Sequence, residues 1–341
     1  MIVELRSDTF TKPSAGMLAA MASAETGDDV FGEDPSINKL ENMTAELFGM
    51  QSALYCPTGT MSNQVAIKVH TQPGDEVICD KSAHVFLYEG GGIAFNSGAQ
   101  VRLLEGNRGQ INATQVSEAV NNRNDVHKAN SSLVCLENTC NRGGGSCYEL
   151  HEIAAIRQVC DANELKLHLD GARLFNALVA TGQKATEFGR LFNSISLCLN
   201  KGLGCPMGSM LVGTKEFIRK ARRVRKVLGG GMRQAGYMAA CGIYALENNI
   251  QRLAMDHEHA KRIANALQGA SYVARVHPVD TNIIVFDVTT GIPAESIAKK
   301  FENENIRVMA IAPTQIRMVT HLDVSSEMVD YVVNFIDAHK K

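Results

Sequence analysis

Lys201 is the residue of this sequence whose position most directly suggests chemistry. It follows the apolar run 195–199 and Asn200, and a loop with three glycines, 202–208, comes after it. A lysine at the mouth of a buried strand has a partly desolvated amine, and desolvation favours the uncharged form that attacks a carbonyl to form an imine. The alternative is a lysine that reaches from the strand end into solvent, and the position alone favours this alternative.

Asp170 ends another apolar run, 166–169, that precedes Lys201 in the chain. Open α/β sheets place their ligands at the carboxyl ends of strands. A carboxylate at such an end can keep a pyridine nitrogen protonated, so that the ring accepts electrons. It can equally cap the helix that follows. Asp170 by itself does not decide between these interpretations.

A threonine-glycine turn and two histidines are further candidates. Thr58-Gly59-Thr60 separates a β-like run from a helical pattern, and free amides at a helix start bind phosphate, although such residues often serve as caps only. His84 follows the run 76–79 and could stack on an aromatic cofactor or move protons. His127 lies in a loop and could also move protons, but an isolated histidine is more often structural.

Two arginines could recognise a carboxylate. Arg173 and Arg317 lie near expected strand or helix ends, and guanidinium groups bind carboxylates through two parallel hydrogen bonds, although most arginines only solvate a surface.

The combination of these motifs is more informative than any one of them. Phosphate turn, histidine, aspartate and lysine occur in that order, each at a strand end. This order predicts a pyridine cofactor with a phosphate, attached to Lys201.

Short β-rich runs alternate with helical patterns up to about residue 215. This order predicts a mainly parallel, doubly wound sheet. The expected strands are 52–56, 76–79, 100–104, 131–136, 166–169, 194–198 and 209–212. The expected helices between them are 61–69, 112–120, 150–162 and 174–181. A further helix is expected after Pro13.

The pattern changes beyond residue 215. A long helical region, 215–225 and 234–267, leads to expected strands at 282–288, 307–310 and 315–319 and to a closing helix, 327–338. We therefore expect a large cofactor-binding domain, residues 1–245 with the N-terminal segment, and a small α+β domain, residues 246–341.

The composition excludes several classes of function. With 34 basic and 36 acidic side chains and a net charge of -2, nothing favours nucleic acid or an anionic membrane as partner. No apolar run approaches the roughly 18–20 residues that cross a bilayer, and the N-terminus does not resemble a secretion signal. The nine cysteines form no CxxC pair, so neither a disulfide framework nor a metal site is expected. A reducing, cytoplasmic location fits best.

With these residues in hand, the sequence closely resembles the low-specificity L-threonine aldolases, which are fold-type-I pyridoxal-phosphate enzymes with a seven-stranded, mainly parallel sheet. The resemblance runs almost from end to end. Its most specific blocks are 5–9, 27–35, 57–63, 137–139, 168–177, 201–208, 229–234 and 319–323.

The resemblance implies a role for each candidate. Lys201 would form the Schiff base with pyridoxal 5′-phosphate, Asp170 would contact the pyridine nitrogen, and His84 would lie against the ring. Thr58, Gly59 and Thr60 would bind the phosphate, and Arg173 would lie close to the cofactor as well. For the substrate, the resemblance implies that Ser7, Arg173 and Arg317 bind the carboxylate. His127 would lie near the hydroxyl, and Tyr88 would belong to the aldehyde pocket. Lys226 and Arg233 resemble residues that a neighbouring subunit contributes to the site.

The implied reaction is the retro-aldol cleavage of L-threonine, L-allo-threonine and related β-hydroxy amino acids to glycine and an aldehyde, which is acetaldehyde for threonine. His84, His127 or a water that they orient would be the base. A homotetramer with shared active sites is implied too. The chain departs from the family pattern at three positions, because Asn200, Cys140 and Phe31 stand where serine, histidine and tyrosine are frequent. These changes concern substrate preference more than cofactor use.

Other functions on the same scaffold stay open. Alanine racemases, β-eliminating lyases and transaminases share the lysine and the aspartate, since the cofactor itself stabilises the carbanion. Racemisation would need a second base opposite Lys201, and the sequence offers no dedicated candidate. A non-enzymatic protein on a decayed scaffold is another alternative, but decay would remove catalytic groups first, and all of them are present.

Overall fold

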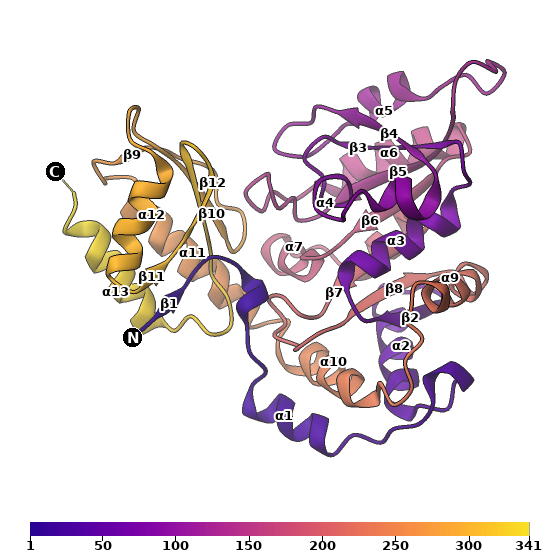
Figure 1. Ribbon diagram of the computed structural model, residues 1–341, viewed down its shortest axis with the longest axis horizontal. Helices are drawn as coiled ribbons and strands as arrows, with labels where there is room; N and C mark the ends of the chain where they lie inside the picture. Colours follow the sequence, from indigo (N-terminus) through magenta and orange to yellow (C-terminus); the bar gives the residue numbers. More distant parts are fainter. Residues whose placement is uncertain (341) are drawn as a thin grey trace.

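A seven-stranded sheet forms the centre of the larger part of the molecule (Figure 1). The computed structural model describes residues 1–340. In spatial order the strands are β2 (Ser52–Cys56), β8 (Ser209–Gly213), β7 (Ser194–Cys198), β6 (Lys166–Asp170), β5 (Asn130–Glu137), β3 (Asp75–Asp80) and β4 (Gln100–Leu104). β8 is antiparallel to β2 and β7, and the remaining neighbours pair in parallel. The predicted α/β fold with a mainly parallel sheet is confirmed.

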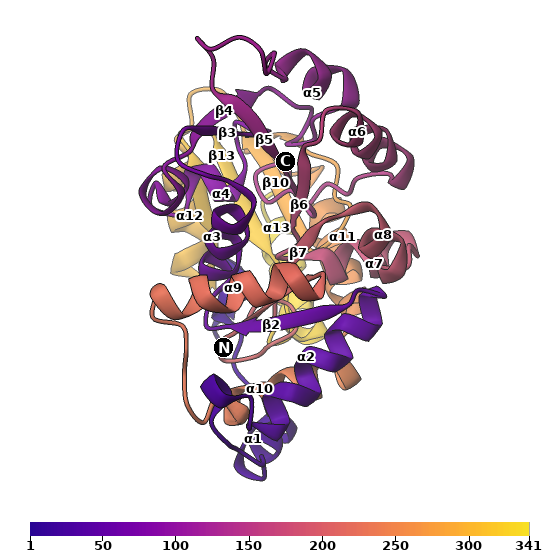
Figure 2. The ribbon, with the colours of Figure 1, turned by 90° about the vertical axis from the view of Figure 1, so that its right-hand side faces the viewer.

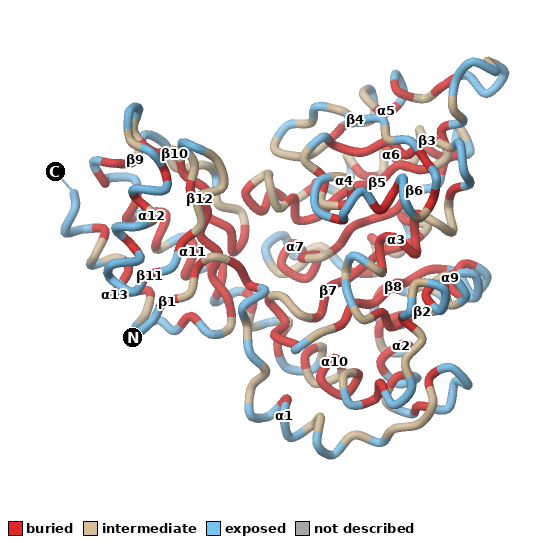
Figure 3. The backbone as a smooth tube through the Cα atoms, in the orientation of Figure 1, coloured by how far each residue is buried: buried red, intermediate tan, exposed pale blue. Residues whose placement is uncertain are grey.

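Helices cover both faces of this sheet, as Figure 2 shows. One face carries α3 (Gly59–His70) and α9 (Lys215–Val227), and the other carries α6 (Leu150–Ala162), α7 (Leu174–Thr181) and α8 (Ala185–Leu191). The central strands are therefore buried on both sides, which explains their nearly continuous apolar sequences. Figure 3 shows them as an almost unbroken buried layer. The other helices of this part are α1 (Ala15–Ala22), α2 (Pro35–Phe48), α4 (His84–Leu87), α5 (Ala113–Ala119) and α10 (Gly236–Asn248).

A smaller α+β unit lies beside this part in Figure 1 and has its own apolar core. Its antiparallel sheet has the order β12-β13-β10-β9, and β11 pairs with the N-terminal strand β1 (Val3–Glu4). The core of this unit takes in Val3 and Leu5. Its other elements are α11 (Leu253–Leu267), β9 (Val273–Val276), β10 (Ile283–Val288), α12 (Ala294–Asn303), β11 (Ile306–Arg307), β12 (Met309–Ala312), β13 (Gln315–Val319) and α13 (Ser326–Asp337).

The structure differs from the expected organisation in three details. The helical stretch expected over 234–267 is two helices, α10 and α11. The residue that caps the end of α10 is Asn249, whose side-chain amide donates to the carbonyl of Leu203. The strand expected at 307–310 is split into β11 and β12. The boundary expected after residue 245 falls inside α10, and the N-terminal strand packs with the smaller unit.

The parallel strands bring the candidate residues to one edge of the sheet. Asp170 is the last residue of β6, Lys201 follows β7, and His84 begins the short helix after β3. All nine cysteines are free thiols. Among residues 1–340, no helix combines the length and the apolar character that a membrane span requires.

Candidate active site

The carboxyl edge of the sheet holds two buried acids side by side. Glu137 ends β5 and Asp170 ends β6, and the two residues are partners in the register of these parallel strands. Burial and the neighbouring Asp170 raise the pKa of Glu137 to about 7. Oxygens of Glu137 accept backbone N–H groups from His84 and Asn141, at 2.8 Å each. Glu137 therefore fixes two loops that border the site.

A cavity of about 180 Å³ opens over Asp170. Its lining includes the residues predicted at the cofactor ring and phosphate, whereas Arg173, also predicted near the cofactor, does not line it. Oδ1 of Asp170 accepts the backbone N–H of Ala172 at 3.1 Å, but Oδ2 is buried and has no hydrogen-bond partner. A buried carboxylate oxygen without a donor is costly. The site thus offers an acceptor for an N–H group that a ligand brings, such as the N–H of a protonated pyridine.

The opposite end of this cavity is built for an anion. Thr58 caps α3 by accepting the N–H of Met61 at 3.1 Å, and the helix then starts with Gly59 and Thr60. A side chain at Gly59 would place its Cβ 2.6 Å from Sγ of Cys198, so glycine is required where the helix start meets β7. The exposed amides of such a helix start suit a phosphate. Asn200 also lines the cavity, so its amide stands where the family commonly has a hydroxyl.

His84 lies at the mouth of the same cavity and has a buried acid as partner. Its Nδ1 is 3.0 Å from Oε1 of Glu89, and its ring tilts against that of Tyr88 with centroids 5.6 Å apart. Burial would lower the pKa of His84, but the hydrogen bond to Glu89 and the charge of Asp170 outweigh it, and the pKa is raised. His84 is thus placed to exchange a proton near neutral pH.

A second cavity, of about 400 Å³, shares Lys201 and His84 with the first and reaches the smaller unit. It contains the predicted substrate residues Ser7, Tyr88, Arg173 and Arg317, together with Thr9, Asn141, Arg142, Met309, Ala310 and Ile311. Lys201 therefore stands between a chamber suited to a phosphorylated ring and a chamber lined by cationic groups.

Arg173 is not free to bind a substrate in the way that was predicted. Its Nε and one Nη donate to the two carboxylate oxygens of Asp8, at 2.7 and 2.6 Å, and both residues are buried. Burial would raise the pKa of Asp8, but the charge and hydrogen bonds of Arg173 lower it to about 2. The charge of the Arg173 guanidinium is thus neutralised by Asp8 of the same chain. Asp8 was not among the site residues predicted from the sequence.

Arg317 is a buried cation of the larger cavity and forms no ion pair among the described residues. Nη1 donates to Oδ1 of Asn141 at 3.0 Å and Nη2 to the carbonyl of Arg6 at 3.1 Å, while the buried Nε has no partner. Its contacts within residues 1–340 include no carboxylate. Burial and the charge of Arg173 lower the pKa of Arg317 to about 10. A buried guanidinium in this state favours an anionic ligand.

Ser7 can support such an anion. It is buried, and its Oγ accepts the N–H and the hydroxyl of Thr9 at 3.3 and 2.9 Å. Because the oxygen is already an acceptor, its own proton is available to a ligand in the cavity. The structure therefore brings Ser7, Arg317, Tyr88, His84 and Lys201 together, as the sequence suggested.

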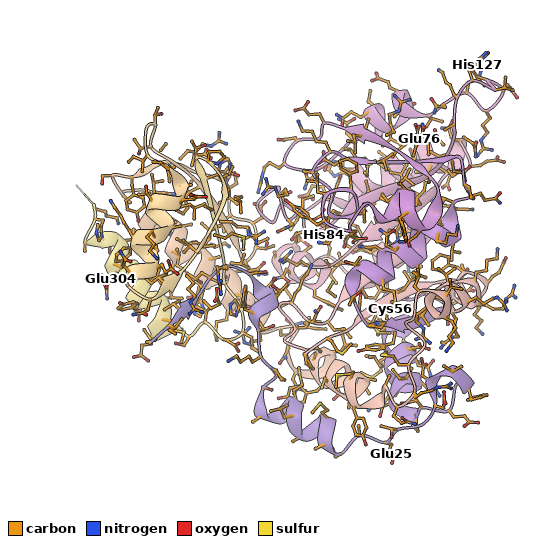
Figure 4. All side chains as sticks on the ribbon, viewed as in Figure 1. Glu25, Cys56, Glu76, His84, His127 and Glu304 are labelled. Atoms are coloured by element: carbon orange, nitrogen blue, oxygen red, sulfur yellow. The ribbon has the colours of Figure 1, made fainter. Side chains whose placement is uncertain are left out.

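Three predicted site residues lie elsewhere in this chain. Figure 4 shows His127 at the outermost tip of the large domain, far from His84, and its side chain is 90% exposed and paired with Asp125. Lys226 and Arg233 are exposed, and neither lines the two cavities. His127 was assigned to the substrate hydroxyl, but its loop precedes β5 and extends into solvent, so His127 lines neither cavity of its own chain.

Comparisons with known proteins agree with this geometry. The family model described as "Beta-eliminating lyase" matches residues 4–290. The chain is 39% identical to a probable low-specificity L-threonine aldolase of Arabidopsis thaliana, over 97% of this chain and 95% of that protein. It is 41% identical to a low-specificity L-threonine aldolase of Escherichia coli, over 96% of each. The fold matches a threonine aldolase of Leishmania major with a TM-score of 0.86 at 20% identity, covering 98% of this chain and 99% of that one.

Proposed function

The chain belongs to the low-specificity L-threonine aldolases of the beta-eliminating lyase family, and on that premise we propose that it cleaves L-threonine, L-allo-threonine and related β-hydroxy amino acids to glycine and an aldehyde. It is a pyridoxal-phosphate enzyme and a carbon–carbon lyase. The observation that carries the proposed substrate class is the pair of chambers that share Lys201 and His84. One has an unpartnered carboxylate oxygen, and the other has an unpaired guanidinium.

The residues of the smaller chamber fit pyridoxal phosphate. Oδ2 of Asp170 would accept the N–H of the protonated pyridine, the start of α3 at Gly59 and Thr60 would bind the phosphate, and Nζ of Lys201 would carry the cofactor covalently. When bound, the cofactor supplies an electron-poor ring that accepts the electron pair of a bond broken at Cα. The side chains of the protein orient the substrate and transfer its protons.

Orientation of the substrate is the first of these tasks. Arg317 and Ser7 would bind the α-carboxylate. Arg173 could contribute only those N–H groups that do not bind Asp8. Because the carboxylate is held at one side of the chamber, the Cα–Cβ bond can be turned to the angle at which its cleavage is favoured. The β-substituent would then face Tyr88 and His84.

Proton transfer is the second task. The proton of the β-hydroxyl must leave as the Cα–Cβ bond breaks. His84 and Lys201 both border the two chambers, and His84 is the one of them that would not carry the cofactor. We assign this proton to Nε2 of His84 or to a water that Nε2 orients. Aldehyde release follows, and a proton added at Cα completes glycine.

The proposed reaction is tested by its products. Purified enzyme with pyridoxal phosphate is expected to release glycine and acetaldehyde from L-threonine and L-allo-threonine, and glycine and benzaldehyde from phenylserine. Alanine should not racemise at a comparable rate, since no second base stands opposite Lys201 in the described chain. Racemisation of alanine without glycine release from any of these substrates would reject the proposal.

We propose that His127, Lys226 and Arg233 act in a neighbouring subunit of a homotetramer. Large apolar side chains are exposed near the last two, with Phe31 at 73% and Val227 at 84%, which favours burial against another copy. His127 stands on a protruding loop, so it can reach a substrate only outside its own chain. A cytoplasmic location is proposed as well, consistent with nine free thiols.

Mixed oligomers test this sharing. The variants His127→Ala and Lys201→Ala should each have little activity alone. If they are unfolded and refolded together, sites that combine an intact Lys201 with a neighbour's intact His127 should regain activity. Mixtures no more active than the separate variants would contradict the proposal, as would full activity of His127→Ala.

A further inference from the structure

A continuous chain of largely buried polar side chains runs from the end of α3 along strands β7 and β6, back to Asn63 of α3 and on to the active-site histidine. His70 Nε2 is 2.8 Å from Oγ of Ser194, which is 2.8 Å from Nδ1 of His168. Nε2 of His168 is 3.2 Å from Oδ1 of Asn63. The amide nitrogen of Asn63 donates to Oε1 of Glu89 at 2.8 Å. The same oxygen of Glu89 contacts His84.

The direction of every hydrogen bond in this chain follows from its last acceptor. A carboxylate only accepts, so Asn63 must turn its NH₂ toward Glu89 and its carbonyl oxygen toward His168. Nε2 of His168 must then carry a proton. Burial lowers the pKa of His168 to about 4, so its ring is neutral near pH 7 and Nδ1 is an acceptor.

The remaining links are fixed in the same way. Ser194 donates its hydroxyl proton to His168, and its oxygen therefore accepts a proton from Nε2 of His70. Burial also lowers the pKa of His70 to about 3, so that ring is neutral as well. His70 is held in place by stacking on Phe217, with ring centroids 4.6 Å apart. All donors in the chain thus point toward Glu89.

Glu89 collects these donors on a side chain that has no solvent exposure. Oε1 accepts from Asn63, and Oε2 accepts from the amide of Gln64 at 2.7 Å. Aligned hydrogen bonds polarise one another, which strengthens the last one in the chain. These two amides hold the carboxylate of Glu89 in place, where Oε1 can also accept the N–H at Nδ1 of His84.

This hydrogen-bonded series of side chains does not carry protons. An amide cannot accept a proton at its oxygen and release another from its nitrogen at any useful rate near neutral pH, so Asn63 interrupts any transfer between His168 and Glu89. The aligned hydrogen bonds instead orient and polarise the donor that Asn63 presents to Glu89. This series of side chains is therefore not a proton path to solvent, and its effect is on Glu89.

We propose that the hydrogen-bonded chain His70–Ser194–His168–Asn63 positions Glu89 as a hydrogen-bond acceptor, and that Glu89 thereby fixes the proton of His84 on Nδ1 and leaves Nε2 as the nitrogen that exchanges protons with the substrate. Asn63, His168 and Glu89 are positioning residues, since they act through His84. A buried carboxylate that orients a histidine base and stabilises its charged form is an arrangement known from hydrolytic triads.

The inference rests on the proposed function only for the task given to His84. The site of its proton and its pKa are properties of the protein itself. The charged groups that face His84 are Glu89 on its own loop, Asp170 at the end of β6 and Lys201 after β7, while Glu137 at the end of β5 binds its backbone N–H. Among residues 1–340, Glu89 alone forms a hydrogen bond with Nδ1 of His84.

Titration of His84 by nitrogen-15 NMR in the holoenzyme tests the inference. The wild type should show a protonated Nδ1 at high pH, and Glu89→Gln should lower the pKa of His84 by about one unit or more, because burial then dominates. The acid limb of kcat/KM should move to lower pH by the same amount. Glu105→Gln, which removes an exposed carboxylate paired with Lys81, is the matched control and should change neither value.

The remote end of the chain has its own test. His168→Gln retains an N–H near the place of Nε2, whereas His168→Leu removes it, so the first should keep the wild-type pKa of His84 and the second should lower it by roughly half a unit. Ser194→Ala, a smaller change, should shift the pKa in the same direction if His168→Leu does not fold. An unchanged pKa of His84 in Glu89→Gln, or equal values in the two His168 variants, would overturn the inference. Absence of aldolase activity would instead reject the proposed function and leave this titration intact.

Discussion

Replacing Lys201 by alanine is expected to lower kcat for threonine cleavage by about 10⁴-fold or more and to abolish the visible absorption of the bound cofactor. Nζ of Lys201 is the amine of the chain that lines both chambers. Without it, the chain loses its covalent anchor, and the nucleophile of a covalent mechanism commonly accounts for losses of this size. Absorption spectra and initial rates of glycine formation measure the two effects.

Lys166→Ala is the matched control for this variant. Lys166 begins β6 at the opposite edge of the sheet and is exposed, so its removal should leave both the absorption and the rate unchanged. Retention of the visible band together with turnover in Lys201→Ala would contradict the assignment of Lys201.

Replacing Arg317 by leucine is expected to lower kcat/KM for threonine by roughly 10²–10³-fold, chiefly through KM, because a charge-assisted pair with the substrate carboxylate is lost. The stability of the protein should change by less than about 1 kcal/mol or even rise, since Arg317 is a buried cation without a carboxylate partner in the described chain. Arg317→Lys should recover part of the affinity, because it keeps the charge but not the planar fork.

Asp8→Asn provides the contrast that makes this prediction specific. It leaves the buried charge of Arg173 without its partner, so a loss of about 3–5 kcal/mol in unfolding free energy is expected. The lowered pKa of Asp8 has a matching consequence. Its stabilising contribution is present above the ordinary carboxyl pKa and is lost as the pH falls toward about 2. Wild-type stability in Asp8→Asn, or wild-type kcat/KM in Arg317→Leu, would show that these two arginines have been assigned the wrong roles.

Local sequence patterns were sufficient for most of the sheet and several helices. The strands at 52–56, 100–104 and 194–198 and the helices at 150–162 and 174–181 have the predicted bounds. In these segments the apolar run or period and the flanking turn residues agree. The helix α2 was overlooked, although Asp34 caps it, Pro35 begins it and Gly49 ends it with a φ of 62°. That signal could have been read from the sequence.

The pairing of distant residues could not be read in the same way. Arg173 and Asp8 are 165 positions apart, and no local pattern states that one neutralises the other. The resemblance placed Arg173 at the substrate without that partner. Glu89 was not among the residues predicted from the sequence, since its role depends on side chains from α3 and β6 that the fold brings together.

His127 illustrates a different limit. A resemblance assigns a residue to a site without saying which copy of the chain owns that site. The folded chain places His127 on a protruding loop away from His84, and the proposed role in a neighbouring subunit starts from this position.

The most direct test of the account is chemical labelling of the wild-type holoenzyme. Borohydride reduces the carbon–nitrogen double bond that joins pyridoxal phosphate to its lysine, and peptide mass analysis then locates the reduced cofactor. A phosphopyridoxyl group is expected on the peptide that contains Lys201 and on no other. Labelling of a different lysine, or no labelling of a protein that still forms glycine from threonine, would contradict it.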